Sequence, residues 1–376
     1  MRVHVIGLGG AGSRIADRLA GDHGGEPFLQ GINAFDTHLE TLDSLANLEE
    51  DRRRRFGDAA GGDGLGGDLH AGRRLGDAHA NELSRAMDDQ RPSLAEAFVL
   101  VVGLGGAAGG GAAPALAEEL DRLYDAPVYA VGVLPATRET EPRTAGRGVR
   151  EERPPRRPLA LKNAARTLAA LEERVDAILP FDNEAWLRRD ETIPEAADRL
   201  NGALSTRLAA LFGAGETPED VATPQQVLDA SDVARIVGSE GEIASIGYAE
   251  QAVESPETNS RFGLGLFGGS EPEAVDASAA VSAIETTIRK ATRGKGTIDV
   301  PDGRADRTLL VVGGPPEWLN RKGIADGRRW LAEETASDAI ISGDAPVPGN
   351  DAVFAVVVRS GIDGPERIVG IRSAIE

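Results

Sequence analysis

The sequence predicts an α/β protein in which a long central helix joins a parallel-sheet N-terminal domain to a smaller α/β C-terminal domain. Three observations predict this fold. Short apolar runs alternate with alanine-rich helical patterns in the first half, two glycine-rich loops each follow such a run, and one long amphipathic helix lies near the middle. At 376 residues the chain exceeds one ordinary core and suits two domains.

The first half alternates strand and helix patterns. The expected strands are Arg2–Ile6, Phe28–Ile32, Phe98–Val102, Val128–Val133 and Ala177–Leu179. The expected helices between them include Ser13–Ala20, Ala112–Leu123 and Asn163–Arg174. Fully apolar strands that alternate with helices indicate a parallel sheet covered on both faces.

Two segments interrupt this alternation and are expected to be loops. Gly57–Gly72 is rich in glycine and aspartate, and Arg138–Pro158 is rich in arginine and proline. The arginine-rich segment is expected to be mobile or salt-bridged at the surface. It could bind a triphosphate or an acidic neighbouring subunit, or its arginines could simply pair with local acids.

The central helix is expected from about Pro194 to Phe212. Its first turn is acidic, leucines recur at helical spacing, and Gly213 ends the pattern. Its length suits a connection between domains at 1–193 and 214–376, with 194–213 as the helix itself. The second domain shows a helical pattern at Ala274–Thr292 and several apolar strands, which favours a small α/β or α+β unit.

The composition is acidic and lacks cysteine. The formal charge is −20, from 61 acidic and 41 basic residues, and only four of the bases are lysines. This balance is typical of a protein kept soluble in high salt, and it argues against nucleic acid as a partner. Without cysteine there is no disulfide or thiolate metal site. No run approaches the length of a membrane span, so the protein is expected to be cytoplasmic.

The first glycine loop, VIGLGGAGSRI, lies between a strand and a helix. Its glycines are Gly7, Gly9, Gly10 and Gly12. Glycine lets the backbone turn tightly beside a phosphate, and the amides of the following helix then face the anion. Alone, this loop is equally compatible with a dinucleotide site in which Asp36 binds the ribose.

The second loop, VLVVGLGGAAGGGAAPALAEEL, repeats the strand–loop–helix order. It has six glycines between Gly103 and Gly111. Such a bare backbone indicates close approach of a ligand or of a neighbouring subunit. Crowding between a helix and a strand is the alternative explanation.

Two loops of this kind resemble the phosphate loops of the tubulin/FtsZ superfamily. The closer resemblance is to CetZ, the tubulin-like proteins of halophilic archaea. Its motifs here are ILPFDNEAW, VLDASDVARIV followed by SIGYA, and GPPEWLNRKGIADGRRWLAEE. They lie along nearly the whole chain, and the last two are specific.

The resemblance implies a site for GTP or GDP, with Mg as a further candidate ligand. The phosphate positions would be Gly9, Gly10, Ala11, Gly12, Ser13, Gly105, Gly106, Ala107, Ala108, Gly109, Gly110 and Gly111. Asn183 and Asn201 match the two asparagines that contact the guanine edge in the family. No metal-ligating residues are assigned.

The resemblance also implies that catalysis is assembled only in a polymer, because the next subunit supplies acidic residues that position the attacking water. The matching residues are Asp229 and Asp232, in the catalytic-loop segment 226–237. An aspartate pair that caps a helix is the competing interpretation, and both roles are compatible.

Several positions depart from the family pattern. Ala108 and Gly110 replace hydroxyl residues of the second loop, and Ala197 replaces the aromatic residue that stacks on the purine. A base, Arg156 or Lys162, stands where a ribose-binding glutamate is expected. A lost phosphate hydrogen bond costs about 1.5–3 kcal/mol and a lost stack about 1–3 kcal/mol, so GTP is expected to bind less tightly than in the family.

The sequence therefore predicts a CetZ-like cytoskeletal protein that binds GTP and forms protofilaments, alone or with a CetZ relative, to control cell shape. The alternative is a pseudo-GTPase that regulates related filaments or assembles with them. A dinucleotide-dependent oxidoreductase is the third hypothesis, but the five histidines are unclustered in the sequence and provide no candidate acid–base residue.

Overall fold

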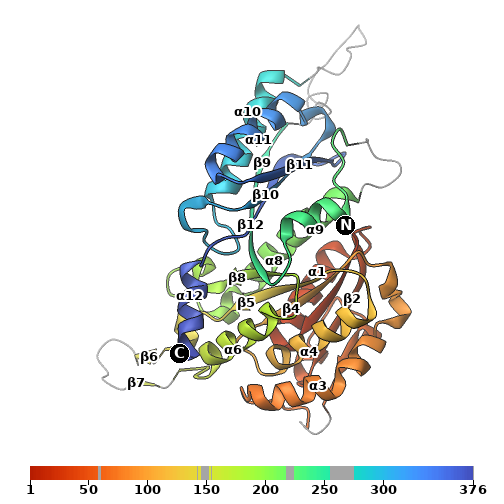
Figure 1. Cartoon of the computed structure of the whole chain (residues 1–376), viewed down its shortest axis with the longest axis vertical. Coiled ribbons are helices and arrows are strands. Elements are labelled where there is room, and N and C mark those ends of the chain that lie inside the picture. Colours follow the sequence, from red (N-terminus) through yellow and green to blue (C-terminus); the bar gives the residue numbers. More distant parts are fainter. Residues whose placement is uncertain are drawn as a thin grey trace, which may run out of the picture.

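Ten strands form one continuous sheet through the whole molecule (Figure 1). The computed structural model describes residues 1–57, 61–141, 143–144, 152–153, 155–216, 224–254 and 275–375. The strand order is β11-β10-β12-β9-β8-β5-β4-β1-β2-β3. The bounds are β1 Val3–Leu8, β2 Leu29–Asp36, β3 Arg53–Arg55, β4 Ala97–Gly103, β5 Val128–Leu134, β8 Ala177–Asp182, β9 Glu242–Ala252, β10 Arg307–Gly314, β11 Ala339–Pro346 and β12 Ala352–Ser360. A separate antiparallel pair joins β6 Arg143–Thr144 to β7 Glu152–Arg153.

Helices cover both faces of this sheet (Figure 1). Their bounds are α1 Gly9–His23, α2 Leu39–Asp43, α3 Leu69–Arg85, α4 Ala108–Leu123, α5 Thr137–Thr140, α6 Ala160–Glu172, α7 Asn183–Trp186, α8 Ile193–Phe212, α9 Ala230–Val237, α10 Ala277–Arg293, α11 Arg321–Thr335 and α12 Glu366–Arg372. Among the helices in the described ranges, none is both long and apolar enough to cross a membrane.

The N-terminal half of the sheet is parallel throughout, as predicted. Strands β1, β4 and β5 are buried on both faces, which explains their unbroken apolar sequences. One face packs against α1 and the central helix α8. The opposite face packs against α4, α6 and the C-terminal helix α12.

The C-terminal half is a mixed sheet. β10 pairs parallel with β11, whereas β12 runs antiparallel to both β10 and β9. Helices α10 and α11 cover one face and α9 covers the other. The two halves join where β8 pairs with β9 through Ala177–Glu242 and Ile178–Ile243. This continuous sheet was not expected from the sequence, because strand pairing across the junction has no local signal.

The structure corrects two expectations about loops. The predicted loop Gly57–Gly72 is too long, since α3 begins at Leu69 and is capped by the Asp68 carboxylate, which accepts the Ala71 N–H at 3.0 Å. The expected loop Arg138–Pro158 includes the short helix α5. Residues 142, 145–151 and 154 lie outside the described residues, and with them Arg147 and Arg150 of the predicted arginine-rich surface.

A buried histidine lies inside the N-terminal half of the sheet. The Nε2 atom of His4 is 2.8 Å from the Asn33 side-chain oxygen, which also accepts the Gln90 amide at 2.6 Å. Asn33 therefore acts as an acceptor, and His4 must hold its proton on Nε2. Burial lowers the pKa of His4 from 6.5 to about 4.

The low pKa of His4 predicts that the folded protein becomes less stable in acid. Between pH 6.5 and about 4 the unfolded chain binds a proton at His4 and the folded chain does not, so the free energy of unfolding falls as the pH falls through this window. The loss is about 3 kcal/mol. In chemical denaturation at several pH values, a His4→Gln variant should lack this component. Identical pH dependence in both proteins would contradict the assignment.

Candidate functional site

The two glycine-rich loops meet at the starts of α1 and α4. A Cβ atom added to Gly109 would lie 2.3 Å from the Leu8 carbonyl oxygen, and one added to Gly9 would lie 2.8 Å from the Gly109 nitrogen. Gly9 also has φ of +68°, a conformation that favours glycine. Both contacts are backbone to backbone, so these two positions require glycine.

Neither of the two helix starts has a side-chain cap. Leu8 precedes α1 and Ala107 precedes α4, and neither can accept a hydrogen bond from the first-turn amides. Other helices of the chain do have a side-chain cap, with Asp68 on α3, Asp276 on α10 and Asn320 on α11, although α6 and α12 start without one. Two converging helix starts with uncapped amides and no acidic residue in the first turn favour an anion.

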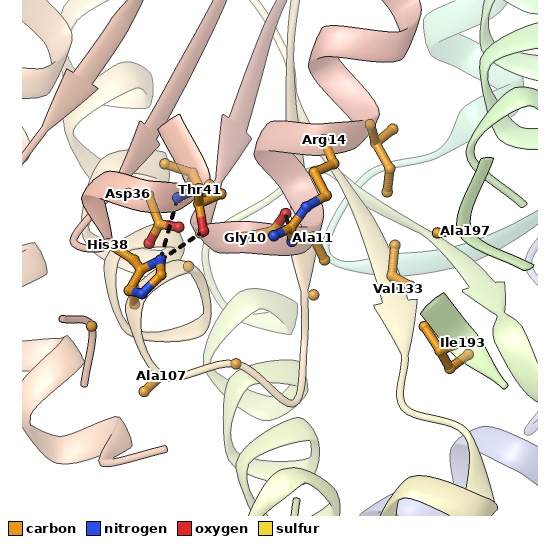
Figure 2. Close-up of a pocket in the computed structure, with 18 of the residues that line it drawn as sticks. Gly10, Ala11, Arg14, Asp36, His38, Thr41, Ala107, Val133, Ile193 and Ala197 are labelled. Carbon is orange, nitrogen blue, oxygen red and sulfur yellow. Dashed lines mark hydrogen bonds between the residues drawn. The ribbon is translucent and has the colours of Figure 1, made fainter. Parts of the chain in front are cut away.

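A cavity of about 390 Å³ lies over these helix starts, within the usual size range of small-molecule sites. One end, at the glycine loops, is polar, and the other is apolar (Figure 2). Val133, Ile193 and Ala197 form part of the apolar end, and Phe181 adds an aromatic ring. Of the residues predicted from the sequence, the cavity is lined by Gly9, Gly10, Ala11, Gly106, Ala107, Ala108, Gly109, Asn183 and Asn201.

Two arginines reach the polar end. The Arg14 guanidinium folds back over the glycine loop and donates to the Gly10 carbonyl at 2.9 Å (Figure 2). Arg157 lines the cavity beside Gly106, and its guanidinium is 3.5 Å from the Glu139 carboxylate. Arg14 was not predicted from the sequence. Arg157 belongs to the arginine-rich segment for which triphosphate binding was one expectation, whereas Arg156 and Lys162, expected at the ribose position, do not line the cavity.

Asp36, at the end of β2, also faces the polar end, together with His38 and Thr41 (Figure 2). The Asp36 carboxylate accepts the Thr37 N–H at 2.7 Å. Burial raises the pKa of Asp36, and nearby hydrogen bonds and charges, including Arg14, counteract that shift. Within the described ranges there is no cluster of three or more His, Asp or Glu side chains able to hold a metal ion.

Asn183 and Asn201 approach the cavity from different elements. Asn183 is the first residue of α7, and Asn201 lies in the middle of the central helix α8. Both are half-buried, and neither side-chain amide bonds to another described residue. Partially buried amides without a protein partner are suited to bind a polar ligand edge.

Five predicted phosphate-loop residues do not line the cavity: Gly12, Ser13, Gly105, Gly110 and Gly111. They lie in the packing beneath it. A Cβ on Gly110 would be 2.6 Å from the Thr167 hydroxyl, and one on Gly111 would be 2.3 Å from the Gly72 backbone. Ser13 is buried. Helix crowding, the alternative raised from the sequence, therefore accounts for part of the second loop.

Asp229 and Asp232 lie at the start of α9, outside the cavity. The Asp229 carboxylate accepts the Asp232 N–H at 2.8 Å, and the Asp232 carboxylate lies 3.4 Å from the Asp229 nitrogen. This reciprocal capping is the alternative role expected from the sequence. The Asp229 side chain is nevertheless exposed and remains accessible to another molecule.

Comparison with known proteins identifies the class. A model of the tubulin/FtsZ family GTPase domain matches residues 2–153, and a model of the C-terminal domain of tubulin-like CetZ matches residues 190–376. With its parallel sheet, paired glycine loops and central helix, the chain has the tubulin/FtsZ fold. The predicted fold class is confirmed.

Individual relatives narrow the assignment. The tubulin-like protein CetZ5 of Haloferax volcanii is 34% identical over 99% of this chain and 91% of its own length. The structure is similar to the GDP-bound monomer of CetZ1 from Haloferax volcanii, with a TM-score of 0.82, 30% identity and coverage of 99% and 98%. The GTPγS-bound protofilament of CetZ2 from the same organism gives a TM-score of 0.80 at 28% identity, with coverage of 100% and 97%. The chain belongs to the CetZ family, which confirms the resemblance.

The contact between the two glycine loops predicts that any side chain at this position lowers the stability of the folded protein. Gly109→Ala should lower the free energy of unfolding by about 1–3 kcal/mol, because the new methyl meets backbone that cannot yield. Gly370→Ala, in α12, is the matched control. No atom lies within 4 Å of its added Cβ, so it should be neutral or stabilising by up to about 1 kcal/mol. Chemical denaturation compares the two, and equal effects would refute the close-approach explanation.

Proposed function

We propose that this protein is a CetZ-type cytoskeletal protein that binds GTP in the cavity over the glycine loops and assembles into protofilaments. Its cellular role would be the control of cell shape, in the cytoplasm. The proposal rests on the convergence of two uncapped helix starts on a cavity that is also lined by two arginines and by two asparagines whose side-chain amides bond to no other described residue.

The two ends of the cavity suit the two ends of a nucleotide. At the polar end, first-turn amides, Arg14 and Arg157 would meet phosphate oxygens, with charge-assisted hydrogen bonds. Asn183 and Asn201 would contact the edge of the base. The base itself would lie against Phe181 and the apolar residues at that end. An Mg²⁺ ion, if bound, would arrive with the phosphates and meet the Asp36 carboxylate.

Self-assembly is proposed from the family. The CetZ2 structure to which this chain is similar is a GTPγS-bound protofilament. In a head-to-tail filament of this chain, the exposed start of α9 would face the nucleotide of the next subunit. Asp229 and Asp232 would then orient the attacking water by accepting its hydrogen bonds. The capping bonds would hold both carboxylates in place for this role.

Two residues of the cavity differ from the family pattern and explain why the expected affinity for GTP is lower than in the family. Ala108 and Ala197 line opposite ends of it, and neither side chain can bind phosphate or stack on a base. Gly110 is different, because Thr167 occupies the space that a side chain there would need. The two arginines are placed to offset part of the loss at the phosphate end.

A double substitution checks this account. Ala108→Thr combined with Ala197→Tyr should raise GTP affinity at least tenfold, since a phosphate hydrogen bond and a base stack are each worth about 1–3 kcal/mol. Isothermal titration in molar KCl gives the affinities. Ala112→Ser, on α4 but outside the cavity, serves as the control. If the double variant binds GTP no better than the parent, the proposed position of the nucleotide is wrong.

Sedimentation in molar KCl tests assembly and hydrolysis together. The protein should pellet with GTP or GTPγS, alone or with a CetZ relative. Asp229→Asn should still cap α9, because asparagine is as good a cap as aspartate. We expect it to assemble but to release phosphate at least tenfold more slowly. Asp276→Asn, at the cap of α10, should behave like the parent.

Three results would change the proposal. A protein that stays monomeric at every concentration, even with a relative, would exclude filament formation. Assembly without phosphate release in the parent would favour the pseudo-GTPase alternative. Normal phosphate release by Asp229→Asn would limit this residue to its capping role.

A further inference from the structure

The last helix of the chain crosses from the C-terminal half to the N-terminal half. After β12 ends at Ser360, α12 lies alongside α6 (Figure 1). Ile368 and Ile371 of α12 are fully buried in the core that also contains Leu168 and Leu171 of α6. The C-terminus is therefore fastened to the domain that contains the cavity.

Arg367 of α12 reaches the segments that flank the cavity. Its Nε donates to the Asp182 carboxylate at 3.3 Å, and its Nη2 donates to the Pro135 carbonyl at 2.5 Å. Asp182 ends β8, and Pro135 directly follows β5. One side chain thus joins α12 to two neighbouring strand ends.

Asp182 in turn sets the start of α7. Its carboxylate accepts the Glu184 N–H at 3.1 Å and so caps a helix of only four residues, the first of which is Asn183. The Glu184 carboxylate accepts the Thr137 N–H at 2.8 Å, which ties α7 to the segment after β5. Such a short helix has little stability of its own and depends on these bonds.

We propose that Arg367 is a positioning residue for the base end of the cavity, acting through Asp182 to hold Asn183 in place. This inference rests on the proposed function. The C-terminal helix α12, packed on the N-terminal half, then holds the α7 turn in place, and the affinity of the cavity for the base depends on this contact. The phosphate end depends on it less, because Arg14 and the glycine loops lie on other elements and Arg157 pairs with Glu139 of α5, which is not a partner of Arg367.

Electrostatics support the arrangement. Burial raises the pKa of Asp182, and the charge of the Arg367 guanidinium is the largest of the effects that oppose this shift. Without Arg367 the carboxylate would be left buried without its counter-charge. It would then either turn toward solvent or take up a proton, and in both cases the cap on α7 weakens.

The chain offers a matched control in Arg372. Like Arg367, this residue joins α12 to the N-terminal half, through a 2.5 Å ion pair with Glu172 of α6. It bonds to neither of the two strand ends that Arg367 contacts. Arg367→Ala should raise the Kd for GTP about tenfold, the loss expected when the Asn183 amide no longer holds its hydrogen bond to the edge of the base. Arg372→Ala should change it less than twofold. Inorganic tripolyphosphate, which lacks a base, should bind both variants as it binds the parent.

Amide hydrogen exchange tests, in the absence of nucleotide, whether Arg367 holds the α7 turn in place. In Arg367→Ala the amides of Glu184 and Leu187, which bond within the α7 turn, should exchange faster than in the parent, and in Arg372→Ala they should not. Arg367→Lys should restore part of the GTP affinity, because an ammonium can still pair with Asp182. If Arg367→Ala folds poorly, Arg367→Lys alone should still show an intermediate Kd.

The outcomes separate the two proposals. Equal losses of GTP affinity in Arg367→Ala and Arg372→Ala would overturn the positioning role, because docking of the helix would then be all that matters. An unchanged Kd in Arg367→Ala, or an equal loss of tripolyphosphate binding, would also overturn it. If the parent itself binds no GTP, the proposed function fails, while the exchange at α7 still decides whether Arg367 holds this turn.

Discussion

The structure depends on the backbone contact between Gly9 and Gly109. Because neither residue carries a side chain, the starts of α1 and α4 lie against each other, and their first-turn amides open onto the same space. Any side chain at either position would push the two helices apart. The position of the cavity over both helix starts follows from this contact.

The glycines of the second loop serve two purposes that the sequence cannot separate. Gly109 allows the contact with the first loop, whereas Gly111 lets α4 pack closely against α3 at Gly72. Gly110 makes room for the Thr167 hydroxyl of α6. The loss of a hydroxyl at position 110 is thus coupled to the packing of α6, while Ala108, which lines the cavity, has no such constraint.

The two halves of the molecule are joined by several kinds of contact. The sheet continues through two residue pairs between β8 and β9, and buried residues of both halves share one hydrophobic core. The central helix α8 packs on both halves, and α12 returns to α6. Arg207 of α8 adds a further link, since its guanidinium stacks 4.5 Å from the Trp186 ring centre and donates to the Lys295 carbonyl. Elements at the base end of the cavity are therefore also elements of the joint.

The sequence by itself determined the features that have local signals. Apolar runs located β1, β2, β4, β5 and β8 but not the arginine strand β3. Glycine spacing located both loops, and the aspartates at the start of α9 indicated a capped helix start. These patterns are set by backbone conformation and burial within a few residues. The family motifs then extended the assignment to nearly the whole chain.

Only the tertiary structure decided which side chains share the cavity. Arg14, Asp36 and Arg157 come from three separate segments, and no local pattern relates them. The same holds for Arg367, whose partner Asp182 is 185 residues away in the chain. Loop glycines that look alike in sequence face the cavity or the packing according to which helix lies behind them. Long-range placement, rather than residue type, settled these roles.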